Sequence, residues 1–255
     1  MPEALEVELT MRASGDLVGR RIEQVEVTDA LVVGAGVDVE VPGATIEALR
    51  RRGKLLLVAT DGPLLGVHFG MTGRFLRDGG AAIERLAYGA GCDDPAWDRW
   101  VVRLDDGTRL RFHDPRRLGR VRLDPDEGRL GPDVLTLRRR HLAEALRSRR
   151  APVKAVLLDQ HAIAGLGNML VDEVLWWSGI DPRRPASSLD ADELATLHAA
   201  IRRRLPVMLR RGGSHTGTLS PSMRVDGAIC RRDGTPLRHD VVGGRSTFWC
   251  PLHQR

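Results

Sequence analysis

The chain begins Met1-Pro2-Glu3, which places a secondary amine beside a carboxylate once Met1 is removed. A secondary amine can attack a sugar aldehyde carbon and form an iminium, which has no nitrogen-bound proton to lose and therefore stays cationic. An α-amino group has an ordinary pKa of about 7.7–8.0, well below that of lysine, so more of it is neutral and nucleophilic at pH 7. Glu3 can move protons during such a reaction. The alternative is a frayed terminus with a solvated Glu3.

A second candidate is Lys54, which ends the run Arg51-Arg52-Gly53-Lys54 before an apolar segment. Only two of the 39 basic residues are lysines, Lys54 and Lys154; the other 37 are arginines. Arginine does not deprotonate in proteins and presents a different shape, so a retained lysine draws attention. A lysine at the start of a strand can hold a phosphate or a sugar oxygen near the nucleophile. The alternative is an ordinary charged turn.

Two loops place apolar side chains where we expect exposed turns. Met71 stands between two glycines in the segment 68–73 (HFGMTG), and a second loop covers 113–119 (HDPRRLG). An apolar side chain on such a tip can fill the gap left when a base leaves the stack, and a nearby arginine can face the orphaned base or a phosphate. The alternative is a β-turn with Met71 in the core. The candidate DNA contacts in these loops are His68, Met71, Arg116, Arg117 and Leu118.

The segments 152–160 (PVKAVLLDQ) and 164–173 (AGLGNMLVDE) predict two helices joined by a Gly-x-Gly-Asn turn. Backbone N–H groups at such a turn, and at the start of the helix after it, bind phosphate well. Asn168 can donate to the same phosphate. The alternative is a plain helical hairpin in which Asn168 caps the second helix.

The tail carries a metal-ligand pattern, C-x2-D-x16-C-x2-H. Two knuckles of this spacing across a hairpin are typical of a zinc ribbon, although Asp is unusual as the second ligand and His239 is another possible ligand. The alternative is a metal-free hairpin held by packing of its aromatic residues. Arg245, on the turn of this hairpin, is a candidate phosphate clamp. The predicted zinc ligands are Cys230, Asp233, Cys250 and His253.

Composition restricts the class of protein. The net charge is +5 and the pI is about 9.8, which suits a polyanionic partner. No apolar run reaches the roughly 18 residues of a membrane span, and the acidic start does not resemble a signal peptide. Three cysteines are too few for a disulfide framework. We therefore expect a soluble cytoplasmic protein.

The hydrophobic pattern predicts an α+β multidomain fold. An amphipathic helix over 3–18 precedes strands at 22–27, 54–60, 64–69, 99–104 and 109–114, short and regular enough for a β-sandwich. Helical periodicity then follows at 140–149, 152–160, 168–179 and 189–211, and the Gly/Ser/Thr-rich stretch 213–224 predicts a flexible connection. The predicted domains are a β-sandwich (1–122), a helical domain (123–212) and a β-hairpin module (213–255).

Taken together, these motifs resemble the formamidopyrimidine-DNA glycosylase / endonuclease VIII family over nearly the full length. Six motifs stand in the family's order: PE, GK before a strand, H-x-G-M-x-G, DPRR-x-G, the paired-helix motif and VGGR. The resemblance implies a β-sandwich domain, a helix–two-turn–helix domain and a zinc-ribbon-like hairpin. It also implies a bifunctional DNA glycosylase/AP lyase of base excision repair that removes oxidised bases and cuts the strand by β,δ-elimination.

The resemblance further implies a role for each candidate residue. Pro2 is the expected nucleophile and Glu3 the acid/base, with Glu6 a second active-site carboxylate and Lys54 assisting at the sugar and phosphate. Lys154, Asn168 and Arg245 are expected to grip phosphates, while Met71, Arg116 and Leu118 fill the void. The expected partner is double-stranded DNA with damaged bases or abasic sites, bound by a monomer associated with the nucleoid; structural zinc is possible, and no catalytic cofactor is expected.

Three departures from the family pattern bear on these expectations. Only two of the usual four cysteines remain in the tail, which makes zinc uncertain. Leu118 stands where an aromatic residue is common. The link between Gly212 and Cys230 is short, which argues against typical 8-oxoguanine recognition and leans slightly towards oxidised pyrimidines or bulkier lesions. Alternative functions are a non-catalytic binder of damaged or abasic DNA and a protein that binds structured RNA.

Overall fold

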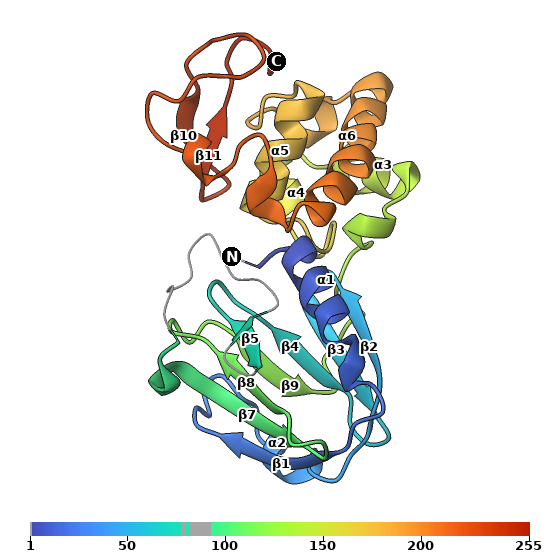
Figure 1. Cartoon of the computed structure of the whole chain (residues 1–255). Coiled ribbons are helices and arrows are strands. Elements are labelled where there is room, and N and C mark those ends of the chain that lie inside the picture. The colour runs from blue at the N-terminus through green and yellow to red at the C-terminus, as the bar shows by residue number, and fades with distance from the viewer. Residues whose placement is uncertain (1, 78–79, 82–92) are drawn as a thin grey trace. The chain divides into compact units, whose positions relative to one another are not determined.

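The computed structural model describes residues 2–77, 80–81 and 93–255, and it divides into two units. The N-terminal unit contains Pro2 and Glu6–Glu127, and the C-terminal unit contains Glu3–Leu5 and Gly128–Arg255. Figure 1 follows the chain through both units. Met1 and Cys92 lie outside the described residues.

Two antiparallel sheets form the β-sandwich of the N-terminal unit, which confirms the predicted architecture. One sheet has the strand order β1-β7-β8-β5-β6 and the other β2-β3-β4-β9. The strands are β1 (Ile22–Val27), β2 (Ile46–Arg52), β3 (Leu55–Thr60), β4 (Leu65–His68), β5 (Arg74–Arg77), β6 (Gly80–Ala81), β7 (Asp98–Leu104), β8 (Arg109–His113) and β9 (Arg120–Leu123). Helix α1 (Ala4–Ala13) precedes them, and α2 (Val37–Glu40) follows β1.

Side chains from both sheets meet in one apolar core because alternate residues of each strand point inwards. Phe112 on β8 is fully buried, and its ring lies 5.8 Å from that of Phe69 and 5.9 Å from that of Phe75. Edge-to-face contacts of this kind add to the energy of apolar burial. The core therefore holds the ends of β4, β5 and β8, where the two predicted loops begin.

The C-terminal unit packs four helices around a separate apolar core and adds a two-stranded hairpin. Leu142, Leu157, Leu170 and Leu197, one from each helix, are all fully buried. The elements are α3 (Arg139–Arg147), α4 (Val153–Leu158), α5 (Asn168–Ser178), α6 (Ala191–Arg210), β10 (Arg238–Val242) and β11 (Arg245–Trp249). The family fold expected from the motifs, with paired helices and a terminal hairpin, is thus present.

The segment 213–224 differs from the predicted flexible connection. It contains two short 3-10 helices, Ser214–Thr216 and Pro221–Met223, and Leu219 between them is buried. Leu219 N donates to Glu173 Oε2 at 2.9 Å, and Trp177 Nε1 donates to Thr218 Oγ1 at 3.2 Å. Polar residues suggested a solvated linker, but side chains of α5 fix the backbone of this segment.

The hairpin belongs to the same unit as the helices, so the division at residue 212 remains a prediction drawn from the sequence. No helix in the described part of the chain is long and apolar enough to cross a membrane.

Candidate functional site

The Glu3 carboxylate is seated on the first turn of α5. Its oxygens accept the backbone N–H groups of Gly167 at 2.8 Å, Met169 at 2.9 Å and Leu170 at 3.2 Å, and the residue is only 1% exposed. A carboxylate is favoured there because the unpaired N–H groups and the helix dipole present positive charge. A side chain at Gly167 would overlap the Glu3 carboxylate and would have to displace it, so glycine favours this contact. The turn between α4 and α5 thus holds the residue next to Pro2.

These hydrogen bonds to Glu3 change the role expected for the turn between α4 and α5. Three of the N–H groups predicted to bind phosphate are occupied by Glu3. Asn168 is the first residue of α5, and Gly167 occupies the N-cap position. Asn168 therefore does not cap this helix, as the alternative of a plain helical hairpin would require. Its Nδ2 donates to the Ser246 carbonyl at 2.9 Å, while its buried Oδ1 has no partner among the described residues. Asn168 therefore joins α5 to the hairpin.

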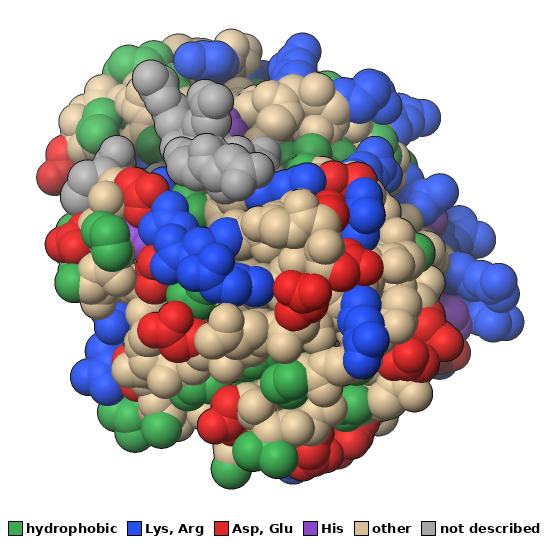
Figure 2. Space-filling model, turned by 60° about the horizontal axis from the view of Figure 1, so that its bottom comes forward, with side chains coloured by type: hydrophobic (Ala, Val, Ile, Leu, Met, Phe, Trp, Pro, Cys, Tyr) green, Lys and Arg blue, Asp and Glu red, His purple; other side chains and the backbone are tan. Residues whose placement is uncertain are grey.

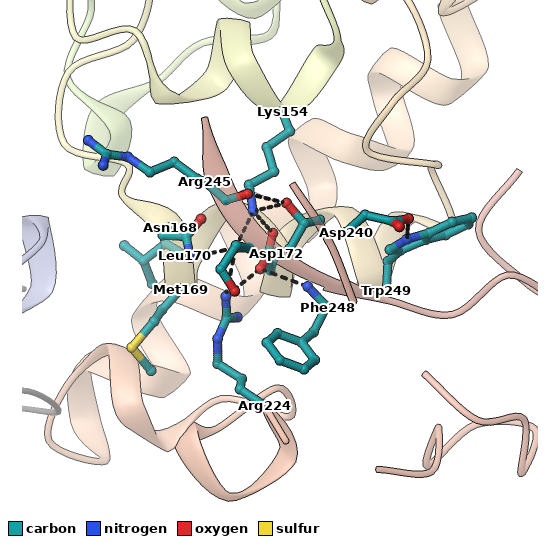
Figure 3. Close-up of polar contacts among 12 residues, drawn as sticks. Lys154, Asn168, Met169, Leu170, Asp172, Arg224, Asp240, Arg245, Phe248 and Trp249 are labelled. Atoms are coloured by element: carbon teal, nitrogen blue, oxygen red, sulfur yellow. Dashed lines mark hydrogen bonds and ion pairs between the residues drawn. The ribbon is translucent and has the colours of Figure 1, made fainter. Parts of the chain in front are cut away.

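A buried charge cluster of Lys154, Asp172 and Arg224 lies beside Asn168 (Figure 3). Lys154 Nζ is 2.6 Å from Asp172 Oδ1, and Arg224 Nη2 is 2.6 Å from Asp172 Oδ2. Lys154 and Asp172 are almost wholly inaccessible, and the Arg224 side chain is 6% exposed. Burial lowers the pKa of Lys154, and the negative charge of Asp172 opposes that shift. One carboxylate thus balances cations from α4 and from the segment before the hairpin.

The same cluster fixes the backbone next to Arg245. The Ser246 carbonyl accepts Lys154 Nζ at 3.1 Å, Asn168 Nδ2 at 2.9 Å and Arg224 Nη2 at 3.4 Å. Gly243 and Gly244 form the two-residue hairpin turn with φ of 59° and 71°, which suits a tight hairpin and disfavours other residues. The Arg245 guanidinium points away from the cluster in Figure 3 and has no hydrogen-bonding partner among the described residues. Arg245 is thus an outward cation on a rigid base.

The geometry of Lys154 does not favour the phosphate contact predicted for it. Its Nζ already has three partners, namely Asp172, the Ser246 carbonyl and Thr247 Oγ1 at 2.8 Å, and no part of the residue is exposed. The sequence could not show this, because the partners lie 18 to 93 residues away along the chain. Lys154 is placed to position the hairpin.

In the N-terminal unit, the β2–β3 turn presents Lys54. Arg51 Nε lies 3.0 Å from Glu8 Oε2 on α1, and Arg51 Nη1 donates to the Gly53 carbonyl at 2.9 Å, so the turn is tied to α1. Lys54 is half-buried at its tip, and Glu6 is buried in the first turn of α1. The candidate lysine is therefore held by the helix that follows the N-terminus.

His68 ends β4 and is opposite Leu55, the residue after Lys54. Its Nδ1 accepts the Gly70 N–H at 3.1 Å. Burial lowers the pKa of His68, and the positive charges of Lys54 and Arg120 lower it further. His68 is therefore neutral at pH 7 and keeps Nε2 as a donor.

The two predicted loops are joined by one carboxylate. Asp114 Oδ1 accepts Thr72 Oγ1 at 2.5 Å, and Asp114 Oδ2 accepts the Gly119 N–H at 2.7 Å. Met71 is half-buried in the first loop and Leu118 in the second is 41% exposed. The structure thus brings the two apolar tips to the same edge of the sandwich.

The paired arginines of the second loop differ from each other. Arg116 is exposed and has no hydrogen-bonding or ionic partner among the described residues. Arg117 has a left-handed backbone, with φ of 57°, and its guanidinium binds Asp29 at 2.5 and 3.0 Å. Arg116 therefore remains available for DNA, whereas the predicted DNA contact of Arg117 would compete with an internal ion pair.

The four predicted metal ligands come together, with one donor atom from each lying within 4.8 Å of the others. His253 Nδ1 is 2.8 Å from Asp233 Oδ2 and 3.6 Å from Cys230 Sγ, and Cys250 Sγ is 3.2 Å from Asp233 Oδ2. His253 Nε2 faces the Trp176 carbonyl at 3.2 Å, which leaves Nδ1 as the ligand atom. His239, the alternative ligand, instead stacks on Phe248. The four residues could therefore hold one metal ion.

Sequence reasoning did not identify Asp172 and Arg224 as site residues. The signal for Asp172 is a charged residue within the helical stretch 169–176, which is otherwise apolar except for the neighbouring Glu173 and is buried throughout. A carboxylate in such a run requires a cationic partner. Nothing local marks Arg224 as that partner among 37 arginines.

Comparison with known proteins identifies the family of the chain. Residues 1–121 match the formamidopyrimidine-DNA glycosylase N-terminal domain, and residues 130–220 match the formamidopyrimidine-DNA glycosylase H2TH domain. The chain belongs to the formamidopyrimidine-DNA glycosylase family. It is thus a DNA glycosylase of base excision repair, in a family whose members also have AP lyase activity.

Relatives cover nearly the whole chain. The formamidopyrimidine-DNA glycosylase of Chloroflexus aggregans is 39% identical, over 84% of this chain and 82% of its own. That of Rhizorhabdus wittichii is 38% identical over the full length of both. The Lactococcus lactis enzyme, solved non-covalently bound to DNA containing an AP site, superposes with a TM-score of 0.85 at 28% identity and 99% coverage of both chains.

The charge cluster predicts a large effect of Asp172→Asn. The change leaves Lys154 and Arg224 buried without a counter-charge, so we expect the free energy of unfolding to fall by about 3–5 kcal/mol. Urea unfolding measures this. Asp181→Asn, which removes only the more exposed pair with Arg183, is the control and should cost no more than about 1 kcal/mol. A loss at Asp172 as small as that of the control would contradict the role of the cluster.

The pKa of His68 predicts a pH dependence. Its folded-state pKa lies below its unfolded value of about 6.5, so folding favours the neutral ring. The folded protein therefore loses stability as the pH falls below about 6.5, where the unfolded chain binds the proton more readily. An NMR titration of the ring should give a midpoint below 6.5. Unfolding measured at pH 7.5 and pH 5.5 should show a smaller acid destabilisation in His68→Gln than in the unaltered protein. A midpoint above 6.5 would disprove the assignment.

Proposed function

We propose that the chain is a bifunctional glycosylase/lyase in which Pro2 is the nucleophile. The observation that carries this proposal is the position of Glu3, whose carboxylate accepts hydrogen bonds from three backbone N–H groups at the start of α5. Because Pro2 is bonded to Glu3, this anchor restricts the position of the terminal amine. A non-catalytic DNA binder has no need of a reactive amine held in this way.

The proposed reaction starts when the Pro2 nitrogen attacks C1′ of the damaged nucleotide. The new N–C1′ bond replaces the glycosidic bond, the Pro2 nitrogen loses its proton, and the base leaves with its electron pair and takes up a proton. The C1′–O4′ bond then opens, a proton goes to O4′, and a cationic iminium remains. Loss of a proton from C2′ expels the 3′ phosphate, and a second elimination expels the 5′ phosphate. We assign these proton transfers to the carboxylates of Glu3 and Glu6.

The remaining candidate residues are assigned to DNA. We assign Lys54, His68, Asn168 and Arg245 to phosphates, since each presents or can present a donor at the end of a structural element. Lys154 is a positioning residue for Arg245. Met71, Leu118 and Arg116 fill the space left by the extruded nucleotide, because two apolar tips and an unpaired guanidinium are suited to unstacked bases.

Oxidised bases are the proposed substrates, with tolerance of bulky ones. The segment 213–224 is held against α5 by Leu219, Thr218 and Arg224, which leaves few residues before Cys230 to cover an extruded base. Similar solved structures include two complexes of the Lactococcus lactis enzyme, one with DNA containing an N7-benzyl-Fapy-dG and one with DNA containing an oxidised pyrimidine. A short cover favours acceptance of varied lesions over strict recognition of one.

A structural zinc ion is proposed for the Cys230, Asp233, Cys250 and His253 group. Bound there, the ion would link the two ends of the hairpin module. Burial raises the pKa of the Cys250 thiol, so metal binding has to displace its proton and weakens as pH falls.

Blocking the terminal amine tests the mechanism. A variant with a non-removable residue before Pro2 keeps the proline ring but turns its amine into an amide, so borohydride trapping and cutting of an abasic duplex should fall by about a hundredfold or more. The affinity of the blocked variant for the abasic duplex should change by no more than about twofold. The control carries the same extension followed by a protease site that restores Pro2. Full cutting by the blocked protein would rule out Pro2 as the nucleophile.

Metal content tests the zinc proposal. Elemental analysis should give one zinc per chain, and Cys250→Ser should lose it together with several degrees of thermal stability. Cys92→Ser removes a cysteine outside the four-residue group and should retain the metal. An unaltered protein that contains no zinc after growth and purification with zinc present would refute the proposal.

A further inference from the structure

Arginine is concentrated in one short stretch of the C-terminal unit. Residues 138–150 contain six arginines and one acidic residue, Glu144. Nearly half of this stretch is arginine, against about one residue in seven over the chain. The bias of the whole sequence therefore does not explain the local density.

Helix α3 packs beside α6, which adds two exposed arginines, Arg202 and Arg203. Arg140 and Arg147 are seven residues apart on α3, which is two helical turns, while Leu142 and Leu146 face the core. Helix α6 contacts the residues just before α3, since Arg202 Nη1 donates to the Leu135 carbonyl at 2.8 Å. We define the α3 basic face by its exposed arginines: Arg138, Arg139, Arg140, Arg147, Arg150, Arg202 and Arg203.

Figure 2 shows Lys and Arg side chains gathered along the right edge of the face that it draws, the side on which α3 lies in Figure 1. Within the C-terminal unit, α3 lies on the opposite side of α4 and α5 from the β10–β11 hairpin (Figure 1). The α3 basic face is therefore distinct from the surface that carries Asn168 and Arg245.

The charges of this face are not used for internal stability. Among the described residues, none of its seven arginines has an ion-pair partner, whereas Arg149 nearby is paired with Asp159 at 2.7 Å. Three of them, Arg138, Arg139 and Arg140, stand at the start of α3, where the helix dipole disfavours cations and no acidic residue is present in the first turn. Their position is unfavourable for the helix and suits an external anion.

The chemistry of the face fits a nucleic-acid backbone better than a protein. Protein interfaces need apolar or aromatic anchors. None of the substantially exposed large apolar side chains in the described ranges belongs to α3 or α6. Repeated cations without anchors match the regular charge of a phosphate backbone, which is bound without regard to sequence.

We propose that the α3 basic face is a second, sequence-independent contact for duplex DNA. It holds phosphates of a stretch outside the damaged site, either further along the same duplex or on a neighbouring one. The choice of duplex DNA rests on the proposed function, while the phosphate chemistry rests on the arginines alone. The contact increases the time the protein spends on undamaged DNA and does not take part in the reaction.

The test compares two triple variants with equal loss of charge. Arg139→Gln/Arg140→Gln/Arg147→Gln alters the α3 basic face, and Arg21→Gln/Arg103→Gln/Arg109→Gln alters exposed arginines of the N-terminal unit. Binding to an undamaged duplex of about 60 base pairs should weaken about tenfold in the first variant, and the slope of log K against log salt should fall by about 2–3. Gln is a good helix former, and circular dichroism checks that α3 is kept.

A second readout separates this proposal from the proposed function. Cutting of an abasic duplex of about 13 base pairs should be the same in both variants and the unaltered protein, because so short a duplex has little length beyond the damaged site. Equal binding of both variants to the long duplex would overturn the second contact. So would a loss of activity on the short duplex as large as the loss of binding to the long one, or a loss of binding seen only with structured RNA. Failure of the unaltered protein to cut the short duplex would instead refute the lyase mechanism. The binding to the long duplex would then still decide whether the second DNA contact exists.

Discussion

The Asp172 carboxylate balances two buried cations, and the arrangement of the C-terminal unit depends on that balance. Lys154 comes from α4 and Arg224 from the segment before the hairpin, and both also donate to the carbonyl of Ser246. Charged groups are removed from water only where close partners compensate them. The cluster therefore specifies one position of the hairpin on α5 and, through Ser246, the base from which Arg245 extends.

A second carboxylate, Glu3, uses the positive end of α5. In many proteins such a helix start binds phosphate. Here the chain's own Glu3 takes three N–H groups of the turn, so the DNA contacts proposed for this region rest on the side chains of Asn168 and Arg245. The same few residues thus connect the expected nucleophile with the elements that are expected to hold the substrate. A change in this turn would affect chemistry and binding together.

The basic residues divide into two groups with different physical roles. Arg51, Arg117 and Arg224 are bound to carboxylates and fix a turn, a loop and a segment. Arg116, Arg245 and the arginines of the α3 basic face extend into solvent. An ion pair satisfies a guanidinium and orders the backbone around it, whereas an unpaired one keeps its capacity to bind phosphate. The net charge of +5 conceals this division.

The sequence by itself determined the local features. Strand alternation, helical periodicity and the two-glycine turn before Arg245 indicated the sandwich, the paired helices and the hairpin, because each depends on neighbouring residues. The spacing of Cys230, Asp233, Cys250 and His253 likewise indicated a metal-binding group. Only the tertiary structure decided the partners of charged residues. Lys154 and Arg117 looked like free cations, yet each meets a carboxylate distant in sequence, Asp172 or Asp29. Such pairing depends on how the chain packs, and no local pattern encodes it.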